Sequence, residues 1–366
     1  MLQHERPRSS GLIYMNLNFN PRDNITAFER IAVPVLAPLT RINRLSIRRI
    51  SVLLKTVKNW YDVVFFKLGL KKGEFTVHLR DGKDVAMANR GDYFSFWGIE
   101  EIQQELLRRH GLGAKIDAKG KTVEFTFMGH KVLFTYDSVK RLAEIDRLIS
   151  DQFVEDGYKW LDAKGREVVD IGANLGDTAI YFALKEAKHV YAFEPYPYSF
   201  DYAIGNIKLN GLQDRVTILN EGCGGESRMV SVDREYQNTA QSSLTDSGKG
   251  QKVQVSSLGD IIRRFGIAHP AILKVDCEGC EYDVILKASD SDLGKFEQIQ
   301  IEYHYGYLNL KNRLEKAGFK VKNTMPRASR NPDRESGNMF LGMIYAHKTQ
   351  IAGSSHEQLG VPQEKQ

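Results

Sequence analysis

The chain has 366 residues, of which 42% are hydrophobic, and it carries 51 Lys/Arg against 46 Asp/Glu. This length predicts roughly two domains, and the apolar content excludes a wholly disordered chain. The sequence has no run of about 18 apolar residues and begins with a polar segment, so we expect neither a membrane-spanning helix nor a secretory signal. Three cysteines exclude a disulfide scaffold and favour a reducing, cytoplasmic location.

The positive charge is concentrated at the beginning of the chain. Residues 1–72 hold 13 Lys/Arg and 4 Asp/Glu, a net charge of +9, so the remaining residues carry −4. Residues 1–30 lack a clear period and predict a loosely structured lead-in, whereas residues 41–68 place apolar side chains at helical spacing among Arg and Lys. We therefore expect a basic, largely helical arm over residues 1–72. Its apolar stripe is expected to pack on the body, although peripheral contact of residues 41–68 with an anionic membrane stays open.

Residues 73–150 predict a small α+β domain. Residues 75–79 and 85–88 flank Asp81-Gly82, which is a hairpin signal. The remaining expected elements are a helix over 94–110, strands at 114–117, 123–128 and 131–136, and a helix over 138–149.

From residue 166 the pattern becomes alternating strand and helix. Residues 168–171 form a largely apolar run, typical of a parallel strand that is buried on both faces. Repeated β-α units of this kind predict a doubly wound α/β domain over residues 151–349. Residues 350–366 are polar and aperiodic, which predicts a disordered tail. The other strands are expected at 190–193, 216–220, 271–275, 298–302, 319–322 and 339–346, and the helices at 175–186, 198–209, 258–265, 281–287 and 308–317.

A glycine turn follows the first of these strands. Gly172 has no Cβ, so a ligand can lie against its backbone at the carboxyl end of the strand, where ligands of open α/β sheets bind. The spacing from Gly172 to Gly176 lacks the middle glycine of a dinucleotide-binding turn, which favours a cofactor without phosphates. Glu194 ends the next strand, 22 residues after Gly172, where a carboxylate can accept hydrogen bonds from both hydroxyls of a ribose. Together these residues predict a nucleoside-binding site.

Polar residues also end the later strands and face the same crevice. Glu221 follows the third strand, where it either lies beside the adenine edge of a nucleoside or is a solvated loop acid. Asp276 ends the fourth strand, close to Glu278, and is expected to orient the reactive end of a cofactor or to take a proton. His304 follows the fifth strand, either as a proton acceptor near neutral pH or as an ordinary surface histidine.

Cys277 and Cys280 lie among these acids. Zinc would need two further ligands, and only one other cysteine and scattered histidines remain. Metal or redox use of the pair is therefore disfavoured, and packing as small residues is expected. No metal site is predicted, although a divalent ion bridging Asp276, Glu278 and Glu302 stays open.

In this order, the motifs resemble the FkbM family of class I S-adenosylmethionine-dependent methyltransferases. The resemblance covers residues 165–347, and its most specific part is the segment from Lys274 to Glu281, because the glycine turn alone indicates only the superfamily. The matching motifs are Val168-Val-Asp170-Ile-Gly172-Ala-Asn174-Leu-Gly176, Phe193-Glu194-Pro195 and Lys274-Val-Asp276-Cys-Glu278-Gly279-Cys-Glu281.

The resemblance implies a Rossmann-like, seven-stranded sheet with an antiparallel last strand, and S-adenosylmethionine as the cofactor. It provides no firm catalytic base, so the catalytic candidates are Asp276, Glu278 and His304. It maps residues of the glycine turn to the cofactor loop, Glu194 to the ribose, and Asp276 and Glu278 to the acids after the fourth strand. With Glu221 included, the cofactor-binding candidates are Asp170, Gly172, Ala173, Asn174, Gly176, Glu194, Glu221 and Asp276.

The expected activity is O-methylation of a hydroxyl on a saccharide, glycolipid or natural-product-like acceptor, with residues 73–150 as a candidate cap. The alternatives are an RNA methyltransferase, suggested by the basic arm, a dehydrogenase, and a methyltransferase-like binding module without catalysis. The acids after the fourth strand crowd the place where a phosphate backbone would pass, which disfavours nucleic acid. The missing glycine disfavours a dehydrogenase, and the retained glycines and acids disfavour a site without catalysis. The oligomeric state is not fixed by the sequence.

Overall fold

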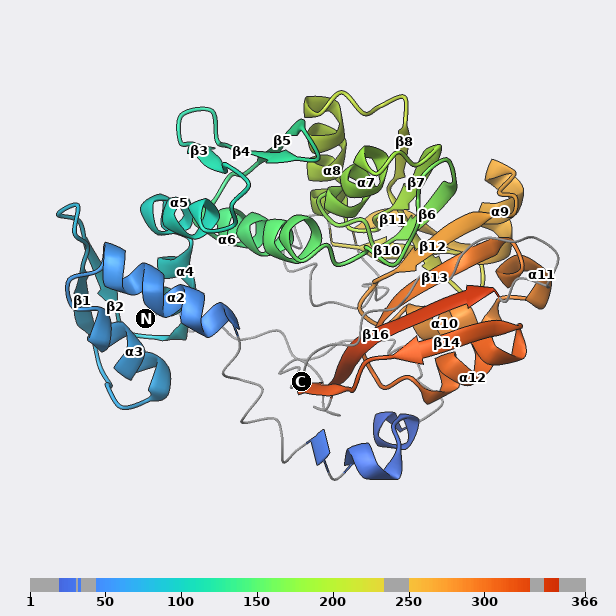
Figure 1. Cartoon of the computed structure of the whole chain (residues 1–366), viewed down its shortest axis with the longest axis horizontal. Helices are drawn as coiled ribbons and strands as arrows, with labels where there is room; N and C mark the ends of the chain where they lie inside the picture. The colour runs from blue at the N-terminus through green and yellow to red at the C-terminus, as the bar shows by residue number, and fades with distance from the viewer. Residues whose placement is uncertain (1–19, 31, 34–43, 234–249, 330–338, 349–366) are drawn as a thin grey trace.

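A mixed sheet lies at the centre of the computed structural model, which describes residues 20–30, 32–33, 44–233, 250–329 and 339–348 (Figure 1). Its strands follow the order β14-β16-β13-β12-β6-β7-β8, and β15 pairs with β16. The last strand runs antiparallel to β13 and β14, whereas the other neighbours are parallel, so the expected sheet is confirmed. The strands are β6 (Glu167–Ile171), β7 (His189–Phe193), β8 (Val216–Leu219), β12 (Ala271–Val275), β13 (Phe296–Tyr303), β14 (Phe319–Asn323), β15 (Arg327–Ser329) and β16 (Met339–Lys348).

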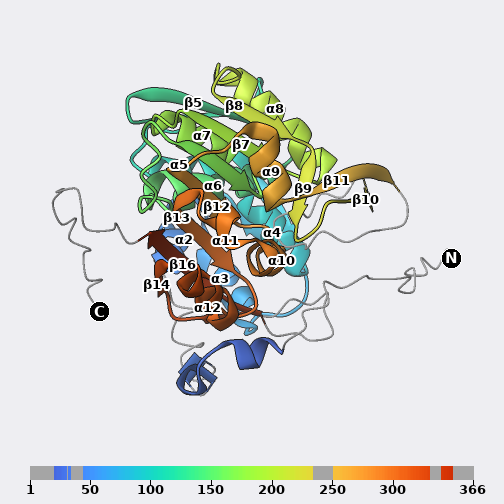
Figure 2. The same ribbon diagram turned by 90° about the vertical axis from the view of Figure 1, so that its right-hand side faces the viewer.

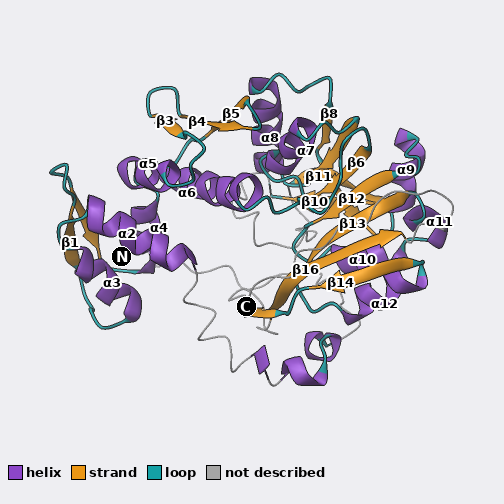
Figure 3. Cartoon of the chain, in the orientation of Figure 1, coloured by secondary structure: helices purple, strands orange, loops and turns teal. Residues whose placement is uncertain are grey.

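Helices cover both faces of this sheet (Figure 2, Figure 3). Along β6, Val168 packs in one core with α7 and α8, whereas Val169 and Ile171 pack in the other core with α9, α10 and α12. Because such strands are covered on both sides, their sequences are largely apolar, and this pattern located them. The helices are α7 (Asp177–Leu184), α8 (Pro197–Leu209), α9 (Leu258–Phe265), α10 (Glu281–Lys287), the short α11 (Asp290–Leu293) and α12 (Leu308–Lys316).

A second, small sheet follows β8 and was not expected. In it, β9 (Glu221–Gly224) pairs in parallel with β11 (Gln251–Ser257), which pairs antiparallel with β10 (Arg228–Val232). The Glu-Gly-Cys-Gly sequence of β9 has no alternation of apolar and polar residues, so periodicity could not reveal it. Glu221 therefore begins a strand of a separate sheet instead of closing the third strand of the main one.

The helix predicted over residues 41–68 is two helices in the described part, α2 (Arg44–Thr56) and α3 (Trp60–Leu68). The chain breaks between them because its backbone pairs with the following hairpin. Val57 forms a β-bridge with Leu79, and the Lys58 N–H donates to the carbonyl oxygen of His78 at 2.8 Å. The hairpin of β1 (Phe75–His78) and β2 (Asp84–Met87) is present as expected.

The helix predicted over residues 94–110 is also divided, into α4 (Arg90–Trp97) and α5 (Glu100–Arg108). Gly98 separates them at a close approach to α6 (Val139–Leu148), which continues as a π-helical turn over Ile149–Val154. A Cβ on Gly98 would lie 2.1 Å from the carbonyl oxygen of Val139, so only glycine permits this contact. Together with α2, α3 and the hairpin, α4 and α5 enclose a core of their own at one end of the molecule (Figure 1).

The strands β3 (Lys115–Asp117), β4 (Thr122–Phe127) and β5 (His130–Thr135) form an antiparallel sheet that packs on the main domain. Asn206 of α8 joins the two: its Nδ2 donates to the carbonyl oxygen of Leu175 at 2.9 Å, and its Oδ1 accepts the Thr135 N–H at 3.0 Å. The aromatic residues of this sheet share a core with α7. The segment predicted as one α+β domain thus contributes to two hydrophobic cores, that of the N-terminal helices and hairpin and that of the main domain. The domain boundaries at residues 72 and 150 stay predictions.

Residues 20–29 differ from the loosely structured lead-in that the sequence predicts. A short 3₁₀ turn, η1 (Pro21–Asn24), lies against the loop after β13, where Asn24 Nδ2 donates to the carbonyl oxygen of Tyr305 at 3.0 Å. The hydroxyl of Tyr307 donates to Glu29 at 3.1 Å, and Ile25 is fully buried. Polar side chains and backbone groups make this contact together with one apolar side chain, Ile25, so no apolar period signalled it.

No helix in the described ranges is long and apolar enough to cross a bilayer. Residues 1–19 of the predicted lead-in and the predicted disordered tail at 350–366 lie outside the described residues.

Asn206→Ala tests the join between the β3–β5 sheet and the main domain. The change leaves the Leu175 carbonyl and the Thr135 N–H without their partner, and an unsatisfied buried polar group costs roughly 1–3 kcal/mol. We expect the free energy of unfolding in urea to fall by about 2–4 kcal/mol. Lys208→Ala, on the exposed side of the same helix, is the control and should change it by less than about 0.5 kcal/mol. Equal effects of the two changes would contradict the join.

Candidate active site

A cavity of about 960 Å³ opens at the carboxyl ends of β6, β7 and β12. We call the part lined by Gly172 and Glu194 the inner part, and the part lined by Asp276, Glu278, Trp160 and Tyr345 the outer part. Side chains of α4, α5 and α6 also border it, so the N-terminal part of the chain covers the cavity. Ligands of open α/β sheets bind at this edge of the sheet.

The turn after β6 fits only glycine at its first position. Gly172 has a φ of +85°, and a Cβ on it would lie 1.7 Å from the carbonyl oxygen of Asp276. The N–H groups of Gly172 and Ala173 both donate to the carbonyl oxygen of Phe193 at 3.0 Å, which ties the turn to the end of β7. The compact turn leaves the backbone of Gly172 open to the cavity, as the sequence predicts.

A buried ion pair supports this turn from behind. Lys274 on β12 is 1% exposed, and its Nζ lies 2.9 Å from Asp170 Oδ1 on β6 and donates to the Gly172 carbonyl oxygen at 2.6 Å. Burial lowers the pKa of Lys274, but the Asp170 carboxylate outweighs it and raises that pKa above its usual value. Asp170 also accepts the Thr178 hydroxyl at 2.5 Å. Asp170 therefore lies behind the cavity wall and positions the turn.

Glu194 lines the innermost part of the cavity. Its Oε2 accepts the Asn174 N–H and its Oε1 accepts the Tyr196 N–H, each at 2.9 Å. Burial raises the pKa of Glu194 to about 8, although these two N–H groups oppose the rise. A carboxylate has about four acceptor positions, so each oxygen retains capacity for a hydroxyl donor.

The other residues predicted for the cofactor loop have different places. Asn174 lines the cavity in a left-handed conformation, with a φ of +45°. Ala173 is fully buried, and Gly176 is the N-cap of α7 and packs against Ala203 of α8, so neither lines the cavity.

Glu221 does not line the cavity either. Its two carboxylate oxygens accept hydrogen bonds from Arg264 at 2.8 and 2.7 Å, and the Ser256 hydroxyl donates to it at 2.9 Å. The neighbouring Gly222 and Cys223 are the part of β9 that borders the cavity. Sequence position alone could not separate these alternatives, because adjacent residues of a strand point to opposite faces.

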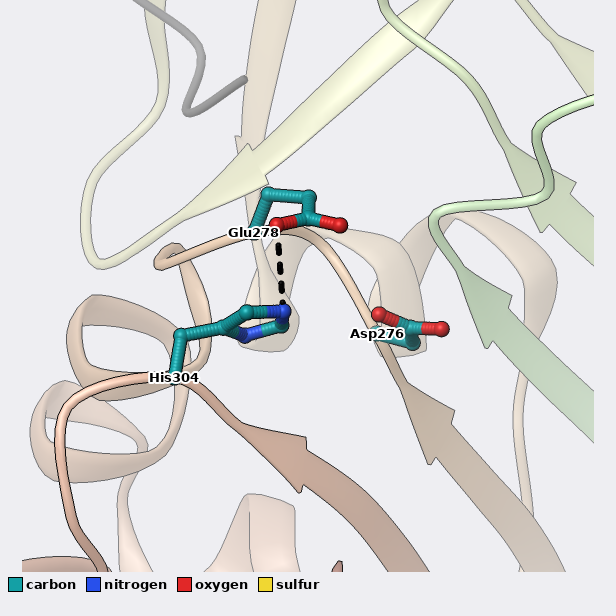
Figure 4. A group of neighbouring side chains, drawn as sticks. All are labelled: Asp276, Glu278 and His304. Carbon is teal, nitrogen blue, oxygen red and sulfur yellow. Dashed lines mark ion pairs between the residues drawn. The ribbon is translucent and has the colours of Figure 1, made fainter. Parts of the chain in front are cut away.

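Asp276, Glu278 and His304 lie close together, and the first two line the cavity (Figure 4). One ligand atom from each lies within 4.8 Å of the others. The first two belong to the loop after β12 and His304 follows β13, so two parallel strand ends supply the group. Glu278 has a φ of +57°, a conformation that non-glycine residues adopt rarely, and its Oε2 lies 3.1 Å from His304 Nε2.

His304 is held on its other side by Glu281, the first residue of α10. The His304 Nδ1 lies 2.9 Å from Glu281 Oε1, which also accepts the His304 backbone N–H at 3.0 Å. Burial lowers the pKa of His304, but the carboxylates of Glu281 and Glu278 outweigh it and raise the pKa well above its usual value. The imidazole is 2% exposed, so it is not the ordinary surface histidine that the sequence left open.

Three further residues of the cavity were not singled out from the sequence as catalytic or cofactor-binding candidates. Glu302 hydrogen-bonds with Asp276, and burial together with that neighbouring charge raises its pKa to about 8. Asp177 begins α7 and accepts from Gln152 at 3.1 Å, and burial raises its pKa to about 7. Trp160, in a loop before β6, packs edge-on against Tyr345. A strand-end signal exists only for Glu302, and the other two need tertiary contacts to be recognised.

Cys277 and Cys280 do not pack as separate small residues, as the sequence predicts, but form a disulfide. The tight turn between β12 and α10 brings their Cα atoms to 5.5 Å, within the range that a disulfide spans. Cys223 is a buried free thiol.

Residues 170–321 match the family model described as the methyltransferase FkbM domain. These residues include the glycine turn, Glu194, Asp276, Glu278 and His304. This part of the chain is therefore similar to methyltransferase FkbM domains. The motif from Lys274 to Glu281 lies inside this match, and it supplies the support for the turn, two acids of the cluster and the residue that orients His304.

Solved structures show a distant likeness to this chain. The methyltransferase FkbM from Methylobacillus flagellatus KT is 14% identical with a TM-score of 0.37, and the match covers 69% of this chain and 60% of that one. A putative RNA methyltransferase from Pyrococcus horikoshii is 12% identical with a TM-score of 0.35, covering 69% and 98%. TYW2 from M. jannaschii, in complex with AdoMet, is 16% identical with a TM-score of 0.30, covering 64% and 90%. At this level of similarity they carry no inference about what this chain binds.

Lys274→Met tests whether the buried ion pair with Asp170 supports the glycine turn. The change leaves Asp170 as a buried charge without its partner, and breaking a buried pair from one side costs about 3–5 kcal/mol of unfolding free energy. The double change Lys274→Met with Asp170→Asn removes both charges and should recover part of this loss in urea unfolding. Lys287→Met, in a half-exposed ion pair on α10, is the control and should cost less than about 1 kcal/mol. A double variant less stable than Lys274→Met would contradict this account.

Proposed function

We propose that this protein is an S-adenosylmethionine-dependent O-methyltransferase acting on a hydroxyl of a saccharide, glycolipid or natural-product-like acceptor. The observation that carries the proposal is one cavity with two chemically different parts. The inner part presents a glycine backbone and the Glu194 carboxylate, and the outer part presents Asp276 and Glu278, with the buried His304 in contact with Glu278. The first suits a nucleoside, and the second suits the reacting hydroxyl.

The residues of the inner part fit the cofactor. Gly172 borders the cavity with its backbone, and Glu194 can accept two ribose hydroxyls on oxygens that already accept backbone N–H groups. When bound, S-adenosylmethionine supplies a methyl group on a positively charged sulfur, and the acceptor oxygen gains the C–O bond as the S–C bond breaks. The chain must hold the two reactants close and in line and must take up the hydroxyl proton. Because this cofactor carries no phosphate, the absence of the middle glycine of a dinucleotide-binding turn does not weaken its binding.

The outer part of the cavity supports a saccharide or similar acceptor. Trp160 and Tyr345 offer aromatic faces with polar groups at their edges, which suits a ring that is apolar on its face and polar at its rim. We assign activation of the hydroxyl to Asp276, Glu278 and His304 acting as one group. Residues of α4, α5 and α6 complete the cavity wall, so this part of the chain would act as a cap over the acceptor.

An RNA acceptor is the alternative that the basic N-terminal arm suggests. The wall of the cavity carries Asp151, Asp276, Glu278 and Glu302 where a phosphate backbone would run, and acids there repel it. We therefore favour an acceptor without phosphates in the cavity. A methyltransferase-like module without catalysis would need neither the strained Glu278 nor the oriented His304.

Peripheral membrane contact through residues 41–68 is part of the proposal, because one side of this segment remains uncovered. The inner side chains of α2 and α3, such as Val52 and Val63, are buried in the N-terminal core. The large apolar side chains that remain exposed are Ile50, Leu54, Tyr61, Phe65 and Leu68. Exposed apolar side chains on basic helices are typical of proteins that dock on anionic lipid surfaces.

Glu194→Gln tests the cofactor assignment. The ionised carboxylate accepts from ribose hydroxyls more strongly than an amide does, and a hydrogen bond to a charged group contributes about 1.5–3 kcal/mol. In calorimetric titration we expect the wild type to bind S-adenosylmethionine more tightly as pH rises through about 8, where Glu194 loses its proton. The variant should bind about 10–100-fold more weakly at pH 9, with a flatter pH dependence.

The control for this titration is Glu186→Gln, which removes an exposed acid that pairs with Lys164 far from the cavity. Its affinity for S-adenosylmethionine should equal that of the wild type at every pH. Wild-type protein that fails to bind S-adenosylmethionine, or a Glu194→Gln variant that binds it equally well, would contradict the proposed function.

The double change Phe65→Glu with Leu68→Glu tests the membrane contact. Two acids on the exposed side of α3 would be repelled by anionic headgroups and would remove apolar area that could insert. We expect the full-length wild type to sediment with vesicles of phosphatidylglycerol and phosphatidylcholine, and the variant to remain in solution. Leu209→Glu, at an exposed apolar residue at the end of α8, is the control and should sediment as the wild type does. Equal sedimentation of all three proteins would refute the contact.

A further inference from the structure

The group formed by Asp276, Glu278 and His304 has the dimensions of a metal site. Ligand atoms of a divalent ion lie about 2.1 Å from it, so neighbouring ligand atoms are about 3 Å apart and opposite ones about 4.2 Å apart. Glu278 Oε2 and His304 Nε2 are 3.1 Å apart, which matches two neighbouring ligands. All three ligand atoms lie within 4.8 Å of one another, so a shift of Asp276 by a few tenths of an ångström, on the scale of those bond lengths, closes the set.

An independent feature outside this group points to a ligand on His304. Glu281 is fully buried, and its Oε1 lies 2.9 Å from the Nδ1 of His304. A hydrogen bond from Nδ1–H to a carboxylate fixes the orientation of the ring and turns Nε2 toward the other side, where a bound ion would take the place of the Nε2 proton. On that side lies Glu278, which lines the cavity together with Asp276. A carboxylate behind a histidine, with acids in front of it, is the usual arrangement around a protein-bound metal ion.

The surroundings also favour a cation by charge. Glu302 lies next to Asp276, so the carboxylates of Asp276, Glu278 and Glu302 meet at this part of the cavity wall. Lys274 is close by but already pairs with Asp170 and donates to the turn. Glu278 also contacts the imidazole of His304. A divalent ion would offset the repulsion between these acids.

We propose that Asp276, Glu278 and His304 bind one divalent cation, of the Mn²⁺ type, at the outer part of the cavity. Two carboxylates favour hard ions such as Mg²⁺ and Mn²⁺, and the imidazole shifts the preference toward Mn²⁺. Three protein ligands leave coordination positions open to the cavity. The role assigned to the ion rests on the proposed function: an acceptor hydroxyl bound at an open position would be oriented and would lose its proton more readily.

The test is calorimetric titration of Mn²⁺ into the full-length protein after treatment with a chelator, without S-adenosylmethionine. The wild type should bind one Mn²⁺ per chain. Glu278→Gln removes a charged ligand at similar size, and we expect its Mn²⁺ affinity to fall by at least 10-fold. Glu315→Gln, at an exposed acid of α12, is the matched control and should bind as the wild type does. Glu278 is not assigned to the cofactor, so the affinity of the variant for S-adenosylmethionine should be unchanged and reports that it is folded.

The outcomes test the ion site and the proposed function separately. One bound Mn²⁺ that is lost with Glu278→Gln and kept with Glu315→Gln supports the ion site. No saturable binding to the wild type, or equal binding to Glu278→Gln, overturns it, and His304 then stands as a charged contact between two glutamates. If S-adenosylmethionine binds in that case, the proposed function survives. If Mn²⁺ binds but S-adenosylmethionine does not, the ion site stands and the proposed function fails.

Discussion

The buried ion pair between Lys274 and Asp170 is the constraint on which both parts of the cavity depend. It joins β12 to β6, and through the Gly172 carbonyl it also holds the turn that borders the inner part. The Asp276 N–H donates to the Ile171 carbonyl oxygen at 3.0 Å, so the loop that carries the acids begins from the same pair of strand ends. Two unpaired charges at these positions would each face a large desolvation cost, which makes this arrangement sensitive to the loss of either residue.

The parts that sequence analysis predicted correctly are those with a strong local pattern. The strands β6 and β12 are largely apolar because both of their faces are covered, and the strand order places their ends side by side. That is sufficient to bring Gly172, Glu194 and Asp276 to one cavity. His304 joined the same site because a parallel neighbour, β13, ends there too.

The remaining features depend on tertiary contacts that no local pattern encodes. The break after α2 exists because Val57 pairs with the hairpin, and the break at Gly98 exists because α6 lies too close for a side chain. Asp170 was predicted to bind the cofactor because it belongs to the cofactor motif. In the structure it lies behind the cavity wall, where it pairs with Lys274 and positions the turn. Glu221 belongs to a separate small sheet, and its carboxylate binds Arg264. The disulfide between Cys277 and Cys280 could be recognised only from the geometry of the turn between β12 and α10.

The contact of Asn24 with Tyr305 spans 281 positions of the chain. On the ribosome, where synthesis proceeds from the N-terminus, residues 20–29 emerge long before the loop they pack against exists. This segment therefore cannot nucleate folding and must wait for β13 and the residues after it. Its docking is a late step, and it occurs on the residue that follows His304.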